Sequence, residues 1–306
     1  MRVADYGRRR FLRIVPAYWL ALVVVVVLIG HHNGVTTHNW WIFFGFGQTY
    51  QLETMPQGIG AAWTLCVEVT FYALLPVLAV VGARLGRNPR SLHGDLALVV
   101  VLGIASVAIH QYIVVGTSHG WTAVNLPGSF YWFALGMALA IASVLHEGRS
   151  PGRGVEQLLI RWPTAFWLAA VAVFVVLCAW APHNARGVGT GSTTEFVLYG
   201  LVALLVLLPA TFAADSGGVA RRALRAPALA WVGLVSYGVY LYHADLIVVV
   251  DRHTRGLPHR YLSVMILAFF VTCLVAGASY YLWERPILRL KEVPFSKLAS
   301  RFTLRG

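Results

Sequence analysis

The sequence predicts an all-α integral membrane protein, a bundle of about eight transmembrane helices with one short interfacial or re-entrant segment. Of its 306 residues, 58% are hydrophobic and only 12% are charged, which is too apolar for a water-soluble globule of this length. The chain also contains repeated apolar runs, each long enough to cross the ~30 Å hydrocarbon core of a bilayer. These runs cover residues 14–30, 64–81, 95–115, 128–145, 164–181, 195–213, 229–250 and 261–283.

The aromatic run at 40–47 (WWIFFGFG) is too short to span a bilayer. Tryptophan and phenylalanine at this density are typical of the membrane interface. The run is therefore predicted to be the interfacial or re-entrant segment.

The distribution of basic residues predicts the orientation of the chain. If the eight spans alternate in direction and the N-terminus is cytoplasmic, twenty of the 24 Lys and Arg residues lie on the inner side. This is the positive-inside pattern, and it predicts a multi-pass protein of the plasma membrane with both termini in the cytoplasm. The need to orient the chain in the membrane therefore explains the net charge of +12, and no nucleic-acid partner is expected.

No soluble domain interrupts the apolar runs, so we expect a single transmembrane domain over residues 1–306, with a cytoplasmic basic tail at 284–306. The three cysteines, Cys66, Cys178 and Cys273, lie scattered in apolar runs without metal-type spacing. Neither a disulfide framework nor a metal site is predicted.

Ionisable groups inside membrane spans are costly and are therefore candidates for function. Four qualify here: Glu68, His110, His243 and Asp245. At ~1.5 Å per helical residue, all four are expected in the outer half of the bilayer. The arginine cluster at residues 8–13 is expected at the inner surface.

Glu68 shares a helical face with Thr64 and Tyr72, because positions four residues apart are neighbours on a helix. This polar stripe has two interpretations. Either Glu68 is catalytic, as a general base or as the residue that orients one, or it is structural and makes an interhelical hydrogen bond.

A second polar face is predicted in the run 229–250, where Ser236, Tyr240 and His243 share one side of the helix. Tyr237 and Tyr240 lie mid-span, where an interfacial aromatic belt does not explain them. His243 is either a proton-transfer group beside tyrosine hydroxyls or a packed histidine bonded to a carbonyl. The isolated His110 favours a structural role.

Arg10 and Arg13 are three residues apart and face the same way. They either anchor the topology or bind phosphate through their planar guanidinium groups. Glu284 and Arg285, where the last span returns to the inner face, are candidates to pair with them. Pro286 is expected to end that helix.

Together these motifs resemble the acyltransferase-3 family of integral membrane acyltransferases. The family's Arg-x-x-Arg followed by Ile/Leu-x-Pro-x-Tyr-Trp matches Arg10 to Trp19, and its Trp-Ser/Thr-Leu-x-x-Glu-x-x-Phe-Tyr matches Trp63 to Tyr72. Its Ser-Tyr-x-x-Tyr-Leu-x-His matches Ser236 to His243, and its Glu-x-Pro matches Glu284 to Pro286.

The resemblance implies transfer of an acyl group, usually acetyl, from acyl-CoA to a hydroxyl of a carbohydrate, lipid-linked sugar or secondary metabolite. It implies that Arg10 and Arg13 hold the donor on the cytoplasmic side. The residues then expected to be catalytic are Glu68, Tyr240 and His243. Those expected to bind substrate are Trp63, Tyr72, Ser236 and Tyr237.

Family members typically have ten core spans, and the first carries a basic residue followed eleven positions later by a catalytic histidine. No such pair precedes Arg10 here, so the chain is expected to be truncated at its N-terminus. Two alternatives stay open. One is an inactive homologue, and the other is a transporter or flippase for a lipid-linked sugar in which Glu68 and Asp245 relay protons.

Overall fold

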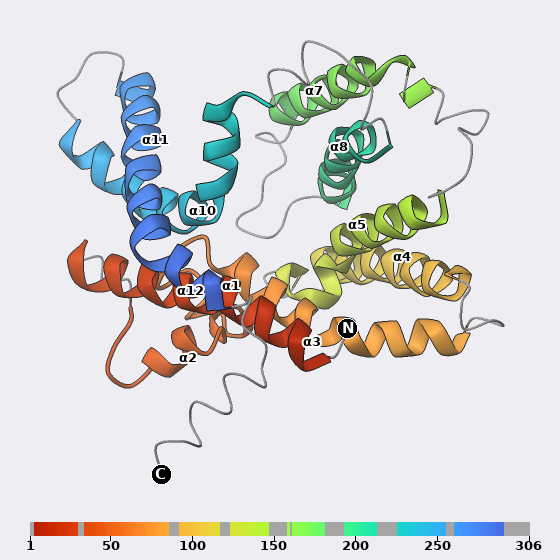
Figure 1. Ribbon diagram of the computed structural model, residues 1–306, viewed down its shortest axis with the longest axis horizontal. Coiled ribbons are helices and arrows are strands. Elements are labelled where there is room, and N and C mark those ends of the chain that lie inside the picture. Colours follow the sequence, from red (N-terminus) through yellow and green to blue (C-terminus); the bar gives the residue numbers. More distant parts are fainter. Residues whose placement is uncertain are drawn as a thin grey trace. The chain divides into compact units, whose positions relative to one another are not determined.

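The computed structural model contains only helices and loops in the residues that it describes (Figure 1). Seven of these helices are long and apolar enough to cross a membrane, and α7 (Pro163–Trp180) is apolar and slightly shorter. The prediction of an all-α membrane protein is confirmed. The described residues are 3–29, 34–85, 92–116, 123–146, 158–159, 161–180, 193–212, 225–254 and 260–290.

The chain divides into two compact units. The first contains Met1–Ala73 and Arg225–Gly306, and the second contains Leu74–Leu224. Helix α3 (Trp63–Leu85) contributes its first half to unit 1 and its second half to unit 2. The proposed cytoplasmic tail lies mostly at residues 291–306, outside the described residues.

Unit 1 is built on four long segments. They are α1 (Val3–Val23), the first half of α3, α10 (Pro227–His253) and α11 (Arg260–Ser279). Helices α10 and α11 lie side by side (Figure 1). Gly238 permits this approach, because a Cβ atom there would lie 3.1 Å from the backbone of Ala276.

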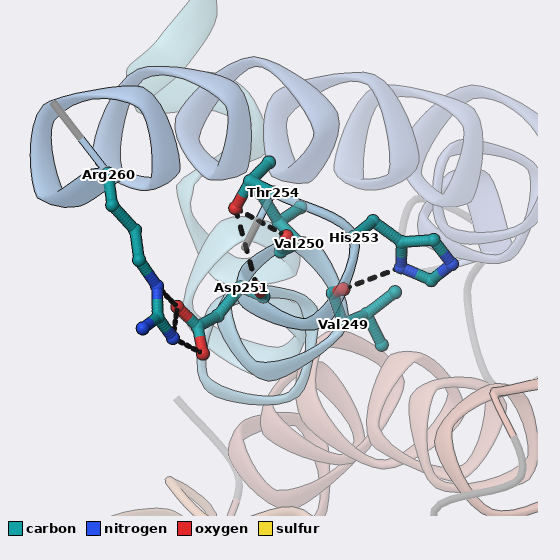
Figure 2. A network of polar contacts seen from close by, with 6 residues as sticks. All are labelled: Val249, Val250, Asp251, His253, Thr254 and Arg260. Carbon is teal, nitrogen blue, oxygen red and sulfur yellow. Dashed lines mark hydrogen bonds and ion pairs between the residues drawn. The ribbon is translucent and has the colours of Figure 1, made fainter. Parts of the chain in front are cut away.

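The loop end of the α10–α11 pair carries a bidentate ion pair. The Arg260 guanidinium donates to both carboxylate oxygens of Asp251, each at 2.6 Å (Figure 2). Because both side chains are exposed, the ion pair adds little to the stability of the fold, and its main effect is on the geometry of the turn. The Thr254 hydroxyl donates to the Val250 carbonyl at 2.9 Å and closes the last turn of α10.

The hydrophobic core of unit 1 surrounds Tyr18, which is 0% exposed. Its hydroxyl donates to the Phe43 carbonyl at 2.9 Å and contacts the Gln48 side-chain oxygen at 3.2 Å. The Trp19 indole donates to the Phe44 carbonyl at 3.0 Å. The Tyr-Trp pair that ends the first motif therefore holds the segment after α1 against that helix. This segment includes α2 (Trp40–Phe44), a five-residue helix at the predicted interfacial run.

Tyr18→Phe is expected to lower the free energy of unfolding by about 1–2 kcal/mol, because two buried acceptors lose their partner. The measurement is the unfolding midpoint of the purified protein in detergent. Tyr112→Phe is the matched control, since Tyr112 is 70% exposed and makes no hydrogen bond to a described residue. Equal midpoints for the two variants would contradict the anchoring role.

Two helix boundaries differ from the sequence-based expectation. Helix α1 begins at Val3, so the arginine cluster lies inside the helix, with Asp5 in the first turn favouring this start. Pro286 does not end the last helix, which continues through α12 (Arg285–Arg289). A π-helical turn, η5 (Tyr280–Glu284), precedes it, and Pro286 falls in the first turn of α12, where its missing N–H is tolerated.

Unit 2 contains α4 (His93–Gly116), α5 (Leu126–His146), α7, α8 (Thr193–Phe212) and the second half of α3. Helices α4 and α5 run antiparallel, because Gly103 faces Ala134 and the Ser106 hydroxyl accepts the Tyr131 N–H at 3.0 Å. Helix α8 packs on both α4 and α5. At Gly200, which has no side chain, α8 lies in close contact with the Tyr131 ring.

Candidate functional site

The first part of the site is a directed chain of hydrogen bonds that links α1 to α3. The Arg10 guanidinium donates to the Tyr72 hydroxyl at 3.4 Å, and that hydroxyl donates to the Glu68 carboxylate at 2.5 Å. The stripe of Thr64, Glu68 and Tyr72 thus forms as the helical spacing predicts. One tyrosine joins the predicted phosphate-binding arginine to the predicted catalytic carboxylate.

The sequence predicts Arg10 at the inner surface and Glu68 in the outer half of the bilayer, yet Tyr72 connects the two side chains. Two features bring them together. Helix α1 begins at Val3, which places Arg10 seven residues inside it, and Tyr72 lies nine residues into α3. A long arginine side chain extends along the apolar surface and carries its charged head to the tyrosine.

The Arg10 guanidinium lies over two aromatic rings. Its guanidinium carbon lies 4.3 Å from the centre of the Tyr72 ring and 5.6 Å from that of Tyr6. Among the described residues it makes one hydrogen bond, so four of its five N–H groups stay available to an anion. The stacking fixes the plane of the guanidinium before any ligand binds.

Arg13 is exposed on the same helix and makes no hydrogen bond or ion pair with a described residue. It therefore supplies a second cation that is free to reach a phosphate. Arg9 is also exposed, and it lies four residues before Arg13, on the same side of α1 as Arg13. The two arginines that the spacing selects thus differ in setting: Arg10 is half-buried and oriented, and Arg13 is open.

The second part of the site joins α3 to α10. The Tyr240 hydroxyl donates to the Ala61 carbonyl and accepts from the Thr64 hydroxyl. Thr64 lies one turn before Glu68, so Tyr240 sits at one end of the polar stripe and Tyr72 at the other. The stripe is about 12 Å long at 1.5 Å per residue.

His243 is oriented by the backbone of its own helix. Its Nδ1 lies 2.7 Å from the Tyr240 carbonyl, and its ring lies 5.9 Å from the Tyr240 ring. A carbonyl only accepts, so Nδ1 carries the proton and the neutral ring presents Nε2 as an acceptor. Nε2 bonds to no described residue, which leaves its lone pair available to a hydroxyl.

Three other predicted substrate-binding residues have defined local settings. The Tyr237 hydroxyl donates to the Ile14 carbonyl at 3.0 Å, which ties α10 to α1. Trp63 begins α3 and is half-buried. Ser236 is exposed, and its hydroxyl donates to the Gly233 carbonyl of its own helix at 2.9 Å.

The expected pairing of Glu284 with Arg10 or Arg13 is wrong. Glu284 is buried and accepts a hydrogen bond from the Ser279 hydroxyl at 3.1 Å. The π-helical turn of η5 rotates the carboxylate inward toward its own helix. Trp283 makes the contact with α1 instead, and its indole donates to the Pro16 carbonyl at 3.1 Å.

Sequence reasoning missed Tyr6 as part of the arginine site. Its hydroxyl donates to the Tyr72 carbonyl at 3.4 Å, and its ring faces Arg10. The signal was present, because Tyr6 precedes Arg10 by four residues and therefore shares its face. It was hidden by the expectation that the first span begins at residue 14.

The two remaining membrane-embedded ionisable residues are His110 and Asp245. His110 belongs to unit 2, where its ring stacks on Phe196 at 4.0 Å between centroids. This contact gives it a packing role. Asp245 is buried on α10. In the described part of the chain, no three His, Cys, Asp or Glu side chains gather in a way that suits a metal ion.

The fold and the polar stripe define a class: a multi-pass membrane protein in which an arginine of α1 is connected through a tyrosine to a carboxylate of α3, and a tyrosine of α10 contacts the same helix. The chain belongs to the family described as Acyltransferase domain, whose model matches residues 3–283. That match spans all of the residues described above as the candidate site.

Three relatives support this assignment. The chain is 24% identical over 300 residues to YrhL of Bacillus subtilis, which is named as a candidate peptidoglycan O-acetyltransferase, and 23% identical over 305 residues to the peptidoglycan O-acetyltransferase OatA of Listeria monocytogenes. It is 25% identical over 318 residues to Nodulation protein 10 of Rhizobium leguminosarum.

These alignments cover 92%, 94% and 94% of this chain. They cover 45%, 46% and 76% of the three relatives, so the chain spans about half the length of the first two. No solved structure matches it.

Proposed function

We propose that this protein is a membrane O-acyltransferase that moves an acetyl group from acetyl-CoA to a hydroxyl of a carbohydrate or lipid-linked sugar. The observation that carries the proposal is the hydrogen-bonded chain from Arg10 through Tyr72 to Glu68. It joins a site suited to phosphate to a site suited to proton transfer. Family membership and the names of two relatives support an O-acetyl transfer to a carbohydrate.

Arg10 and Arg13 bind the phosphates of the donor in this proposal. A guanidinium matches the geometry of phosphate oxygens and stays charged at every physiological pH. The positive-inside pattern supports a donor site on the cytoplasmic side of the plasma membrane. The thioester arm of acetyl-CoA then extends along the polar stripe toward Thr64.

The transfer step needs a base for the acceptor hydroxyl. The hydroxyl oxygen attacks the thioester carbonyl, its proton passes to the base, the C–S bond breaks and CoA leaves as a thiol after taking up a proton. We assign the base role to Glu68 or to Nε2 of His243, both of which have acceptor lone pairs at the stripe.

In this scheme Tyr240 organises the acceptor side of the site, because its hydroxyl connects α10 to the start of α3 and its backbone carbonyl orients His243. Trp63 and Tyr237 flank the stripe and are assigned to substrate contact. Ser236 is also assigned to substrate contact, because its hydroxyl donates to Gly233 and keeps lone pairs that accept a hydrogen bond.

The test uses acetyl-CoA labelled in its acetyl group, added to membranes of cells that carry the gene with its natural flanking DNA. The proposal expects label in a carbohydrate or lipid-linked sugar fraction and release of free CoA. Movement of a lipid-linked sugar without consumption of acetyl-CoA would instead indicate a transporter. No turnover in membranes that contain folded protein would indicate an inactive homologue.

A further inference from the structure

Unit 2 contains an apolar furrow between α4, α5 and α8 that takes no part in the polar stripe. Its volume is about 650 Å³, and its lining includes Val99, Gly103, Ala108, Leu135, Ala138 and Val197. No lining residue in the described part of unit 2 is charged. Three lining residues have polar side chains, and their positions are informative: Gln111, Tyr131 and Thr193.

Small residues create the furrow. Helices α4 and α5 touch at Gly103, where an added Cβ would lie 3.0 Å from that of Ala134. Helix α8 approaches α5 at Gly200, where a Cβ would lie 2.5 Å from the Tyr131 ring. On either side of these contacts, Ala108 and Ala138 leave the floor of the furrow unfilled.

The furrow has a length and a polarity. Along α4 its lining extends from Val99 to Gln111, which is about 18 Å at 1.5 Å per residue. Its polar groups gather at one end, because Gln111 lies near the end of α4, Thr193 begins α8 and Tyr131 lies in the second turn of α5. The antiparallel pairing of α4 and α5 places Ala138 toward the opposite, wholly apolar end.

These dimensions match one chain of a bilayer lipid. A leaflet contributes about half of the ~30 Å hydrocarbon thickness, or about 15 Å. A chain in one leaflet begins at a polar interface and ends in pure hydrocarbon, as the furrow does. Water would find no hydrogen-bonding partners along the apolar walls, so the hydrocarbon chains of the surrounding lipid are expected to fill the furrow.

We propose that the furrow is a binding site for one hydrocarbon chain of a membrane phospholipid, with the head group at the end marked by Gln111 and Thr193. Since no lining residue is charged, the site recognises the chain and does not select the charge of the head group. The proposal is independent of the acyl-transfer function, because all the residues that carry it belong to unit 2.

The test places the purified protein in lipid nanodiscs that contain a phospholipid with a photoreactive diazirine in its acyl chain. After irradiation, labelled peptides are mapped by mass spectrometry. The wild type is expected to carry label concentrated on the furrow segments of α4, α5 and α8. Ala138→Leu, which fills the apolar end, is expected to lower that labelling about tenfold.

Gly136→Leu is the matched control. It places the same leucine side chain on α5, but a Cβ atom there meets nothing within 4 Å. This variant is expected to keep the labelling of the wild type. Ala108→Leu provides a second furrow-filling variant on α4, so the test survives if one variant fails to fold.

Labelling spread evenly over all apolar helices, or lowered equally in Gly136→Leu, would overturn the proposal. A second arm compares diazirine-bearing phosphatidylethanolamine with phosphatidylglycerol. Equal labelling of the furrow by both is expected. A tenfold preference for the anionic lipid would overturn the inference that the chain alone is recognised.

Discussion

Glu68→Gln is expected to lower the rate of acetyl transfer by about 100-fold or more, the range associated with loss of a general base. The amide keeps the size of the side chain and still accepts the hydrogen bond from Tyr72, but it no longer takes up a proton. Binding of acetyl-CoA is expected to change little, because Arg10 and Arg13, the proposed phosphate-binding residues, stay in place. The measurement is labelled acetyl transfer in membranes, alongside the dissociation constant for acetyl-CoA.

Glu195→Gln is the matched control for this prediction. Glu195 is a buried carboxyl of unit 2, on α8, and it has no place in the polar stripe. Its variant is expected to keep the wild-type rate. Full activity in Glu68→Gln would leave His243 as the base, and loss of activity in His243→Ala with Glu68 intact would then identify it.

Arg10→Ala is expected to raise the dissociation constant for acetyl-CoA by about 10- to 100-fold, as loss of a charged hydrogen-bonding group would do. It is also expected to lower the rate, because the Arg10 side chain orients Tyr72 and, through it, Glu68. Arg13→Ala is expected to weaken donor binding with little change in rate, since the hydrogen bonds that orient Tyr72 and Glu68 come from Arg10 and not from Arg13. Protection of the protein by acetyl-CoA against thermal unfolding measures the binding.

Two further variants separate this prediction from a general effect of charge. Arg84→Ala removes an exposed cation near the end of α3, twelve residues after Tyr72, and it is expected to bind acetyl-CoA as the wild type does. Arg10→Lys keeps the charge but loses the planar stacking between Tyr6 and Tyr72, and it is expected to recover only part of the binding. Undiminished protection in the Arg10→Ala, Arg13→Ala double variant would exclude this donor site.

Local contacts were predictable from the sequence, and contacts between distant segments were not. The Glu68–Tyr72 bond follows from a spacing of four residues on one helix. The Thr64–Tyr240 contact joins positions 176 residues apart, and only the packing of α10 against α3 creates it. Periodicity selects the face on which Tyr240 lies, but it carries no information about which helix that face meets.

The sequence also misplaced groups wherever the helix departed from regular geometry. Glu284 was assigned to the arginines because a regular helix ending at Pro286 would present it to the inner surface. A π-helical turn and a helical restart gave it Ser279 as a partner instead. Likewise, the early start of α1 at Val3 brings Tyr6 to Arg10, which a helix beginning at residue 14 would not do.

The π-helical turn at η5 affects how this chain is compared with its relatives. A helical wheel assumes a constant rotation of about 100° per residue. A π-helical turn holds more residues than an α-helical turn, so wheels drawn across Tyr280–Glu284 assign the following positions to the wrong faces. If the faces of Trp283 and Glu284 are counted from Arg260 on such a wheel, the exposed position of Trp283 and the buried position of Glu284 will be confused. The faces should be counted separately on each side of the turn.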